Sequence, residues 1–214
     1  MVQSSKIVCV ALVAILGVLG AEAQNPCQNV QGMANLNATR LAGMWYEAVR
    51  APAANVACIR VNAQNANNNT QMTITTWSSS STTSSYMNQQ QSATLNVTMV
   101  NANTGFNVTY NSTNSVNTTY VILDTDYNTY VSVCGYTTPN ANSSFGAIFT
   151  TSQSPNSTWV DGLVNATSQV LLNFNSTTVS KVNQMNCYAS SASTSLPVLS
   201  SVFAALYVLA KFLN

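Results

Sequence analysis

Few side chains in this chain of 214 residues are suited to acid–base chemistry. The sequence contains no histidine, so it lacks the usual general base and the commonest metal ligand of proteins. Asp124 and Asp126 lie two residues apart, and a pair of acids can serve as acid and base in glycoside hydrolysis. They lie in an expected turn, with no wider set of polar groups around them. The residues therefore argue against an enzyme, and no cofactor is expected.

Four of the five cysteines are expected in the mature protein. Cys9 lies in a segment that is expected to be removed, which leaves an even number for a secreted domain. This count predicts two disulfides, and the residues alone leave three connectivities open. A zinc site is the alternative, but the sequence has neither a C-x-x-C spacing nor a histidine, so no metal is expected. The four are Cys27, Cys58, Cys134 and Cys187.

Charged side chains make up 5% of the chain, and between residues 24 and 188 they balance. So few charges form neither a basic patch for nucleic acid nor an acidic patch for cations. Nucleic acid is therefore not an expected partner, and the hydration of the protein must come from another source. The charged residues are Arg40, Arg50, Arg60 and Lys181 against Glu47, Asp124, Asp126 and Asp161.

Glycan is the predicted source of hydration. The N-x-S/T acceptor pattern occurs ten times, and each site that carries a glycan must face solvent. Some sites arise by chance in a chain so rich in Asn, Ser and Thr, so not all need be used. The acceptors are Asn37, Asn68, Asn96, Asn107, Asn111, Asn117, Asn142, Asn156, Asn165 and Asn175.

Residues 1–23 are typical of a secretory signal peptide. Lys6 precedes an apolar run from Ile7 to Leu19, and Ala21-Glu22-Ala23 gives a small-x-small cleavage site. A transmembrane helix is the alternative, but spanning a bilayer takes ~20 apolar residues and this run is shorter. We expect residues 24–188 to form a single domain that passes through the secretory pathway.

Residues 189–214 are typical of the signal for a GPI anchor. Small residues and a short polar spacer precede an apolar tail that runs to the last residue. The tail would be removed, and lipid would attach at Ser190, Ser191 or Ser193. A transmembrane helix is the first alternative, disfavoured by the proline and lysine in the tail; a core helix is the second, disfavoured by its position after the last cysteine. The sequence therefore predicts a protein on the extracellular face of the plasma membrane, or a secreted one.

Polar and apolar residues alternate with period two from Trp45 to Phe149, and turn-rich clusters separate the runs. Many short strands of this kind are typical of an all-β barrel or sandwich. A helix is expected over about 157–170, capped by Asn156 or Ser157, with a short strand near 177–182 after it. The expected strands before the helix are 43–52, 57–64, 70–77, 92–100, 104–112, 117–124, 128–136 and 145–151.

The glycan acceptors fix which face of a strand points outward. A glycan must face solvent, and residues i and i+2 share one face of a strand. Asn96, Asn107 and Asn117 therefore turn apolar or aromatic neighbours inward on three strands. These inner faces fit either a packed core or a cavity for an apolar ligand, and periodicity does not separate the two. The inward residues are Leu95, Val97, Met99, Phe106, Val108, Tyr110, Tyr120 and Ile122.

With these residues the chain resembles the lipocalins, and among them the apolipoprotein D-like group that includes insect bilin-binding proteins and Lazarillo. The stretch NPCQNVQGMANLNATRLAGMWYEAVRAP is similar to the family's opening cysteine, short turn and Gly-x-Trp motif. LDTDYNTYVSVC is similar to its Thr-Asp-Tyr motif, and STWVDGLVNATSQ and VNQMNC are similar to its helix and last cysteine. The resemblance covers nearly the whole mature chain. It implies an all-β fold, an eight-stranded antiparallel up-and-down barrel with one C-terminal α-helix.

The resemblance also implies roles for single residues. Trp45 would pack under the N-terminal turn and be structural rather than ligand-binding. Lipocalins of this kind carry an arginine after the eighth strand that stacks on the tryptophan, whereas Thr151 stands near that place here. The residues that would close the narrow end of the barrel are Gly43, Trp45, Asp126 and Tyr127. The implied disulfides are Cys27 with Cys134 and Cys58 with Cys187.

The leading functional hypothesis is a monomeric binding protein for a small hydrophobic molecule. Lipid, sterol, retinoid, pheromone and bilin all fit, with bilin ranked below an uncharged lipid because bilins carry propionates. By the register above no charge faces the interior, so the ligand should be neutral or keep its charge at the open mouth. The residues expected to bind it are Ile59, Val97, Met99, Phe106, Val108, Tyr110, Tyr120, Ile122, Val131 and Phe149.

The alternative is a GPI-anchored glycoprotein that acts in cell-surface recognition or adhesion, with a filled barrel and no ligand. An enzyme ranks third, because catalytic lipocalins use a cysteine or a histidine in the cavity. Every mature cysteine here is expected to be bridged, and histidine is absent. Whether the barrel holds a cavity or a packed core separates the first two hypotheses.

Overall fold

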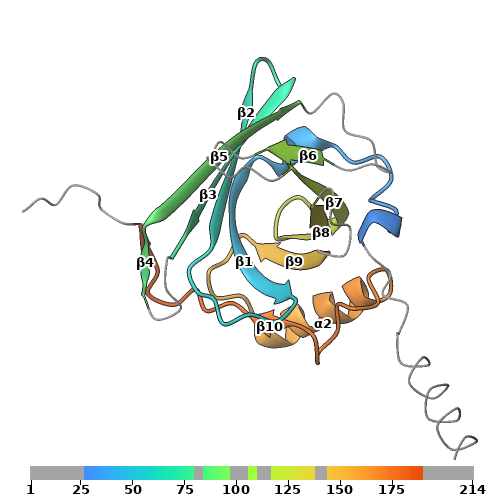
Figure 1. The fold of residues 1–214 in the computed structure, drawn as a ribbon, viewed down its shortest axis with the longest axis vertical. Helices are drawn as coiled ribbons and strands as arrows, with labels where there is room; N and C mark the ends of the chain where they lie inside the picture. The colour runs from blue at the N-terminus through green and yellow to red at the C-terminus, as the bar shows by residue number, and fades with distance from the viewer. Residues whose placement is uncertain (1–26, 80–83, 97–105, 110–116, 138–143, 190–214) are drawn as a thin grey trace, which may run out of the picture.

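The computed structural model describes residues 27–79, 84–96, 106–109, 117–137 and 144–189. An antiparallel sheet curls around an interior, and a helix lies against its outside (Figure 1). Hydrogen-bonded neighbours follow the order β5-β3-β2-β1-β9-β8-β7-β6, which confirms the eight-stranded antiparallel fold expected from the sequence. The strands are β1 (Gly43–Ala51), β2 (Arg60–Ala66), β3 (Gln71–Ser78), β5 (Gln89–Asn96), β6 (Phe106–Thr109), β7 (Asn117–Thr125), β8 (Tyr130–Thr137) and β9 (Phe145–Thr150).

Each expected strand overlaps one of these eight, and three further strands are two residues long. The strand expected near 177–182 is β10 (Ser180–Lys181), which pairs with the end of β1. A parallel pair formed by β4 (Tyr86–Met87) and β11 (Tyr188–Ala189) was not expected, because two residues carry no detectable alternation. The expected signal peptide and the expected GPI attachment residues Ser190, Ser191 and Ser193 lie outside the described residues.

The single described α-helix, α2 (Ser157–Ser168), packs one apolar face on the barrel. The Asn156 side chain caps it, with Oδ1 accepting the Trp159 N–H at 3.1 Å, as one of the two expected caps. The helix ends two residues before the expected limit, because the Gln169 N–H turns back to the Ala166 carbonyl and tightens the last turn. The buried face consists of Val160, Leu163, Val164 and Thr167.

Two apolar layers lie on the two faces of the sheet. On β7, Val121 belongs to the layer between sheet and helix, and Leu123 packs against it. Ile122 belongs to the layer inside the barrel, and Tyr120 packs against that one. The strand therefore turns Tyr120 and Ile122 inward, as the glycan acceptors predicted.

Two disulfides tie the segments outside the strands to the barrel. Cys27 opens the 3₁₀ helix η1 (Cys27–Asn29) and is bonded to Cys134 of β8. Cys58, just before β2, is bonded to Cys187 next to β11. The pairing implied by the resemblance is thereby confirmed, and two bridges agree with folding in an oxidising compartment.

Candidate ligand cavity

The barrel encloses a cavity of about 700 Å³. The cavity extends from the 3₁₀ helix η2 (Ala38–Leu41), whose Leu41 lines one end, to residues 52–58 at the other end. The end beside η2 is closed by Leu41, Trp45, Ala63, Met72, Leu95, Ile122, Val131 and Phe149. The end towards residues 52–58, called the mouth below, is lined by Pro52, Ala54, Val56 and Ala57.

Trp45 is part of the closed end and of the cavity wall. Its indole is 4% exposed and packs in one cluster with Ala38 and Leu41. The indole N–H donates to the Leu41 carbonyl at 2.8 Å, so the only polar atom of the ring is satisfied by η2. The residue thus packs under the N-terminal turn, and its ring also faces the cavity.

The outer side of the closed end is held by the turn between β7 and β8. Tyr127 accepts the Asn37 N–H at 3.0 Å through its hydroxyl, and the Arg40 guanidinium lies 4.2 Å from the Tyr127 ring centre. Thr151 donates to the Asn128 carbonyl at 3.1 Å. A cation therefore does cover an aromatic ring at this end, but it comes from η2 and stacks on Tyr127 rather than on Trp45.

Five of the residues expected to bind a ligand line the cavity: Ile59, Tyr120, Ile122, Val131 and Phe149. Phe106 and Val108 lie in β6, where the backbone alone is described. Val97, Met99 and Tyr110 lie outside the described residues. Sequence reasoning missed the lining residues of β2 and β3, although they alternate with period two: Val61, Ala63, Met72, Ile74, Thr76 and Ser78.

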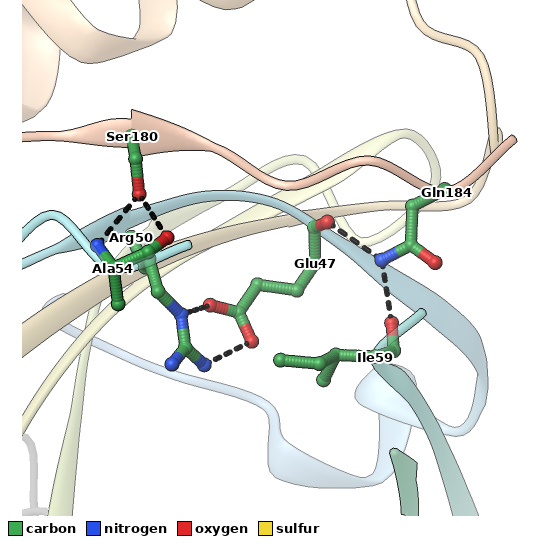
Figure 2. Close-up of polar contacts among 6 residues, drawn as sticks. All are labelled: Glu47, Arg50, Ala54, Ile59, Ser180 and Gln184. Carbon is green, nitrogen blue, oxygen red and sulfur yellow. Dashed lines mark hydrogen bonds and ion pairs between the residues drawn. The ribbon is translucent and has the colours of Figure 1, made fainter. Parts of the chain in front are cut away.

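An ion pair in the cavity wall contradicts the expectation that no charge faces the interior. Glu47 and Arg50 both line the cavity. The Arg50 Nε donates to Glu47 Oε1 at 2.6 Å, and Nη2 donates to Oε2 at 2.9 Å. Figure 2 shows this bidentate ion pair. The expected register came from strands β5, β6 and β7 and did not include β1. Trp45 and Glu47 lie two residues apart on that strand, and this spacing is the signal that would have revealed Glu47.

A β-bulge brings Arg50 to the same face as Glu47. Residues three apart in a regular strand point to opposite faces. Here Glu47 pairs with Phe149 and Val49 with Ile148, so Ala48 is an extra residue that shifts the alternation. Val49 therefore belongs to the apolar layer under α2. Arg50 lines the cavity next to Ala147, its paired residue on β9.

The two charged side chains differ in burial. The Glu47 side chain is 3% exposed and the Arg50 side chain 30%. Burial raises the pKa of the Glu47 carboxyl above its usual value, and the hydrogen bonds and charge of Arg50 lower it only in part. The pair therefore combines a carboxyl whose burial favours its neutral form with a guanidinium that is partly exposed beside the cavity.

The C-terminal segment fixes the backbone around this pair. Gln184 donates its amide Nε2 to the carbonyls of Glu47 and Ile59, both at 2.8 Å (Figure 2). The Val182 N–H donates to the Ala48 carbonyl at 2.9 Å, and the Ser180 hydroxyl bonds both the N–H and the carbonyl of Ala54. The bulge and the mouth segment are thus bound by residues 180–184.

The expected glycan acceptors can be placed in part. Asn37, Asn68, Asn156 and Asn165 are exposed, and Asn175 is half-buried with its side-chain oxygen bonded to Thr177. Asn96, Asn107 and Asn117 lie in strands where the side chains are not described, and Asn111 and Asn142 lie outside the described residues.

No group of three metal-ligating side chains comes together within the described ranges. In the same part of the chain, no helix has the length and apolar character needed to cross a membrane.

The sequence matches no family model and no curated protein. Several solved structures share the fold. Insecticyanin from the tobacco hornworm Manduca sexta superimposes with a TM-score of 0.58 at 15% identity, over 77% of this chain and 90% of that one. Lobster apocrustacyanin A1 gives 0.51 at 19% identity, over 72% and 90%. The siderocalin Ex-FABP gives 0.53 at 12% identity, over 70% and 98%. The structural neighbours are lipocalins, and at these identities they establish the fold: the chain has the lipocalin fold.

Proposed function

We propose that this protein is an extracellular binding protein that carries a small hydrophobic molecule inside its barrel. The observation that carries the proposal is the cavity of about 700 Å³, whose wall is mainly apolar. Ligand pockets in proteins generally span ~300–1,000 Å³, with a few polar groups that orient the ligand. A filled barrel would have favoured the adhesion scaffold, so the cavity favours the carrier.

The comparisons support binding as the function of this fold. The siderocalin Ex-FABP is described as functioning through dual ligand specificities. We place the chain in the apolipoprotein D-like group of lipocalins on its Gly-x-Trp and Thr-Asp-Tyr motifs, and we propose binding without catalysis. The expected ligand residues Ile59, Tyr120, Ile122, Val131 and Phe149, joined by Trp45 and Met72, would contact the body of the ligand.

The first experiment identifies the cargo. The glycoprotein is purified from its own tissue and extracted with organic solvent, and the extract is analysed by mass spectrometry and visible absorption. We expect a stoichiometric apolar compound. An empty extract, together with no quenching of tryptophan fluorescence by a panel of lipids and retinoids, would contradict the proposal, because Trp45 faces the cavity.

A matched pair of variants on β2 shows whether the cargo lies in the barrel. Val61→Trp places an indole into the cavity wall, whereas Gln64→Trp places it on the exposed outer face of the same strand. We expect the first variant to lower affinity on the order of tenfold, about 1.4 kcal/mol, and the second to leave it unchanged. Equal affinities in the two variants would place the cargo elsewhere.

We also propose that a GPI anchor holds the protein on the extracellular face of the plasma membrane, on the strength of the sequence of residues 189–214. Treatment of intact cells with a phospholipase specific for phosphatidylinositol anchors should release the protein into the medium. Retention on the cells would remove the anchor from the proposal and leave the carrier function unaffected.

A further inference from the structure

The Glu47–Arg50 pair assigns a chemical class to the cargo, and this inference rests on the proposed carrier function. We propose that the cargo is an amphipathic acid, such as a long-chain fatty acid, whose carboxylate binds Arg50 beside Glu47 while its hydrocarbon body fills the closed end of the barrel. The carboxylate joins an existing ion pair, and Glu47 takes up a proton from solvent when it does so.

The arrangement of polar and apolar lining residues orients such a ligand. Trp45 and Met72 belong to one apolar cluster with Leu41 at the closed end, and Phe149 packs against it. Arg50 follows Glu47 along β1 on the way to residues 52–58 at the mouth. A chain that enters with its apolar end first would bury that end against the closed end. Its head group would then come to rest beside Arg50.

The Arg50 guanidinium has N–H donors that its ion pair with Glu47 does not use. An arginine carries five N–H groups, and the two hydrogen bonds to Glu47 use two of them. Within the described residues Arg50 makes no hydrogen bond to any other side chain, and Figure 2 shows its second terminal nitrogen pointing away from Glu47. Free N–H donors on a cation bind best to an anionic acceptor. The planar guanidinium matches the two oxygens of a carboxylate.

Glu47 does not offer a comparable site for a cationic ligand. Both of its oxygens already accept a hydrogen bond from Arg50, and its side chain is 3% exposed against 30% for Arg50. A ligand that approaches from the mouth therefore meets the donor side of the pair first.

A second carboxylate beside Glu47 leaves an excess negative charge in an apolar cavity, which is unfavourable. A proton on Glu47 removes this excess, and burial already raises the pKa of this carboxyl. The remaining ionisable groups are placed differently. Tyr120 lines the cavity from β7, Arg60 stacks on Trp77 at 4.5 Å, and Lys181 is paired with Asp161 of α2 outside the barrel. Glu47 is thus the described carboxyl positioned to take up the proton.

The pair is held ready for the ligand by the backbone. The Ala48 bulge aims both side chains inward, and Gln184 and Val182 bind the carbonyls of Glu47 and Ala48. Because these contacts come from another part of the chain, the site does not have to be assembled when the ligand enters.

The test compares three ligands that differ only in the head group: oleic acid, oleyl alcohol and methyl oleate. Binding to the delipidated glycoprotein is measured by calorimetry in two buffers of different ionisation enthalpy, between pH 6 and 8. We expect the acid to bind at least about tenfold more tightly than the other two, with proton uptake, and with an affinity that rises as the pH falls.

Variants assign the effect to the two residues. Arg50→Gln should weaken the acid about tenfold or more and leave the alcohol unchanged, and Glu47→Gln should keep acid binding but abolish proton uptake and the pH dependence. The double variant Glu47→Gln/Arg50→Gln carries no buried charge and serves if the single Arg50 variant does not fold. Arg40→Gln, which removes a cation at the far end of the barrel, is the matched control and should bind like the wild type.

The outcomes separate this inference from the carrier function. Equal affinities for acid and alcohol, or an acid preference that survives in Arg50→Gln, overturn the inference and leave the carrier standing. Failure of the acid to bind also overturns the inference, whatever the tissue extract contains. Failure of all three ligands together with an empty extract removes both.

Discussion

Asp126 shows how one exposed carboxylate organises a turn. Its oxygens accept the N–H groups of Asn128, Thr129 and Tyr130 and the Thr129 hydroxyl, and the Tyr127 backbone has a φ of 66° between them. Burial acts to raise the pKa of Asp126, but these hydrogen bonds outweigh it and lower the pKa to about 2. The ionised carboxylate thus fixes the turn that carries Tyr127, and through Tyr127 the closed end of the barrel.

We predict that Asp126→Asn destabilises the protein by about 1 kcal/mol at neutral pH, since an amide accepts fewer and weaker hydrogen bonds than a carboxylate on an exposed turn. The contribution of a carboxylate with a lowered pKa is present above the unfolded value of about 4 and is lost as the pH falls towards 2. Urea unfolding at pH 7 and at pH 2.5 should therefore show a gap between wild type and variant that closes in acid. A gap that stays constant would contradict this account.

Single residues also show which side-chain positions the sequence alone could predict and which it could not. Tyr120 and Ile122 could be placed inside because Asn117, on the same strand, had to face solvent. On β1 no glycan acceptor indicated which face points outward, so the inward position of Glu47 was not predicted. Arg50 could not be placed by alternation, because the bulge at Ala48 shifts the alternation between Glu47 and Arg50 and no local sequence pattern marks it.

At the scale of elements, β9 and the segment after α2 meet through a glycine. A Cβ built on Gly146 would lie 2.6 Å from Phe174 and 2.9 Å from Leu171, both of which are buried. Gly162 in α2 has nothing within 4 Å of the same position. A glycine-to-alanine substitution therefore adds a methyl group to a crowded site at Gly146 and to an open site at Gly162.

We predict that Gly146→Ala destabilises the protein by about 1–3 kcal/mol, because the added methyl group would overlap the buried Phe174 and Leu171 side chains and force them to shift. Gly162→Ala should stabilise it by about 0.5–1 kcal/mol, because alanine loses less backbone freedom in a helix. Guanidinium unfolding of the two variants beside the wild type measures both. A neutral or stabilising effect of Gly146→Ala would show that the contact with Phe174 is not tight.

The cap of α2 gives a second prediction at this scale. Asn156→Ala removes the bond to the Trp159 N–H and should cost about 1 kcal/mol. Asn165→Ala on the exposed face of the same helix is the control, because it removes a glycan acceptor as well but no cap. Thermal unfolding of both glycoproteins separates the loss of a cap from the loss of a glycan, and a similar loss in both would contradict the assignment of Asn156 as the cap.

Which elements were predictable depends on what specifies them. The eight strands and α2 are each specified by their own hydrophobic pattern, so their existence and order could be predicted. β4, β10 and β11 are two-residue strands whose pairing comes from tertiary contacts, such as the Tyr188 N–H bond to the Ser85 carbonyl. The contents of the barrel were not predictable either, since an apolar inner face fits a core as well as a cavity.

At the scale of the whole molecule, the two disulfides close overlapping loops of similar size, with sequence separations of 107 and 129. Loop-closure entropy predicts that the two differ in stabilisation by only ~0.2 kcal/mol. They differ in what they hold. Cys27–Cys134 joins η1 to β8, whereas Cys58–Cys187 joins the C-terminal segment to the mouth of the cavity.

We predict that replacing either pair of cysteines by serine costs about 2–5 kcal/mol in chemical unfolding. Ligand affinity should fall mainly in Cys58→Ser/Cys187→Ser, because the mouth residues Val56 and Ala57 then lose their covalent tie. Calorimetric titration of both double variants with the cargo found in the tissue extract measures this difference. Equal losses of affinity would mean that the second bridge has no special part at the mouth.

The Cys58–Cys187 bridge also decides how the molecule carries mechanical tension. A pull on Ala189 passes from Cys187 through the sulfur atoms to Cys58, so strands β2 to β10 lie outside the shortest covalent path to Cys27. If the other end of the chain is held at Cys27, the Cys27–Cys134 bridge opens a longer path through residues 134–187, whereas residues 27–58 are the shorter path and reach roughly 110 Å when fully extended. β1 is the one long strand in that stretch, and it carries Glu47 and Arg50. Tension between Cys27 and Ala189 would therefore act on the charged pair in the cavity before it acted on the strands outside this shortest path.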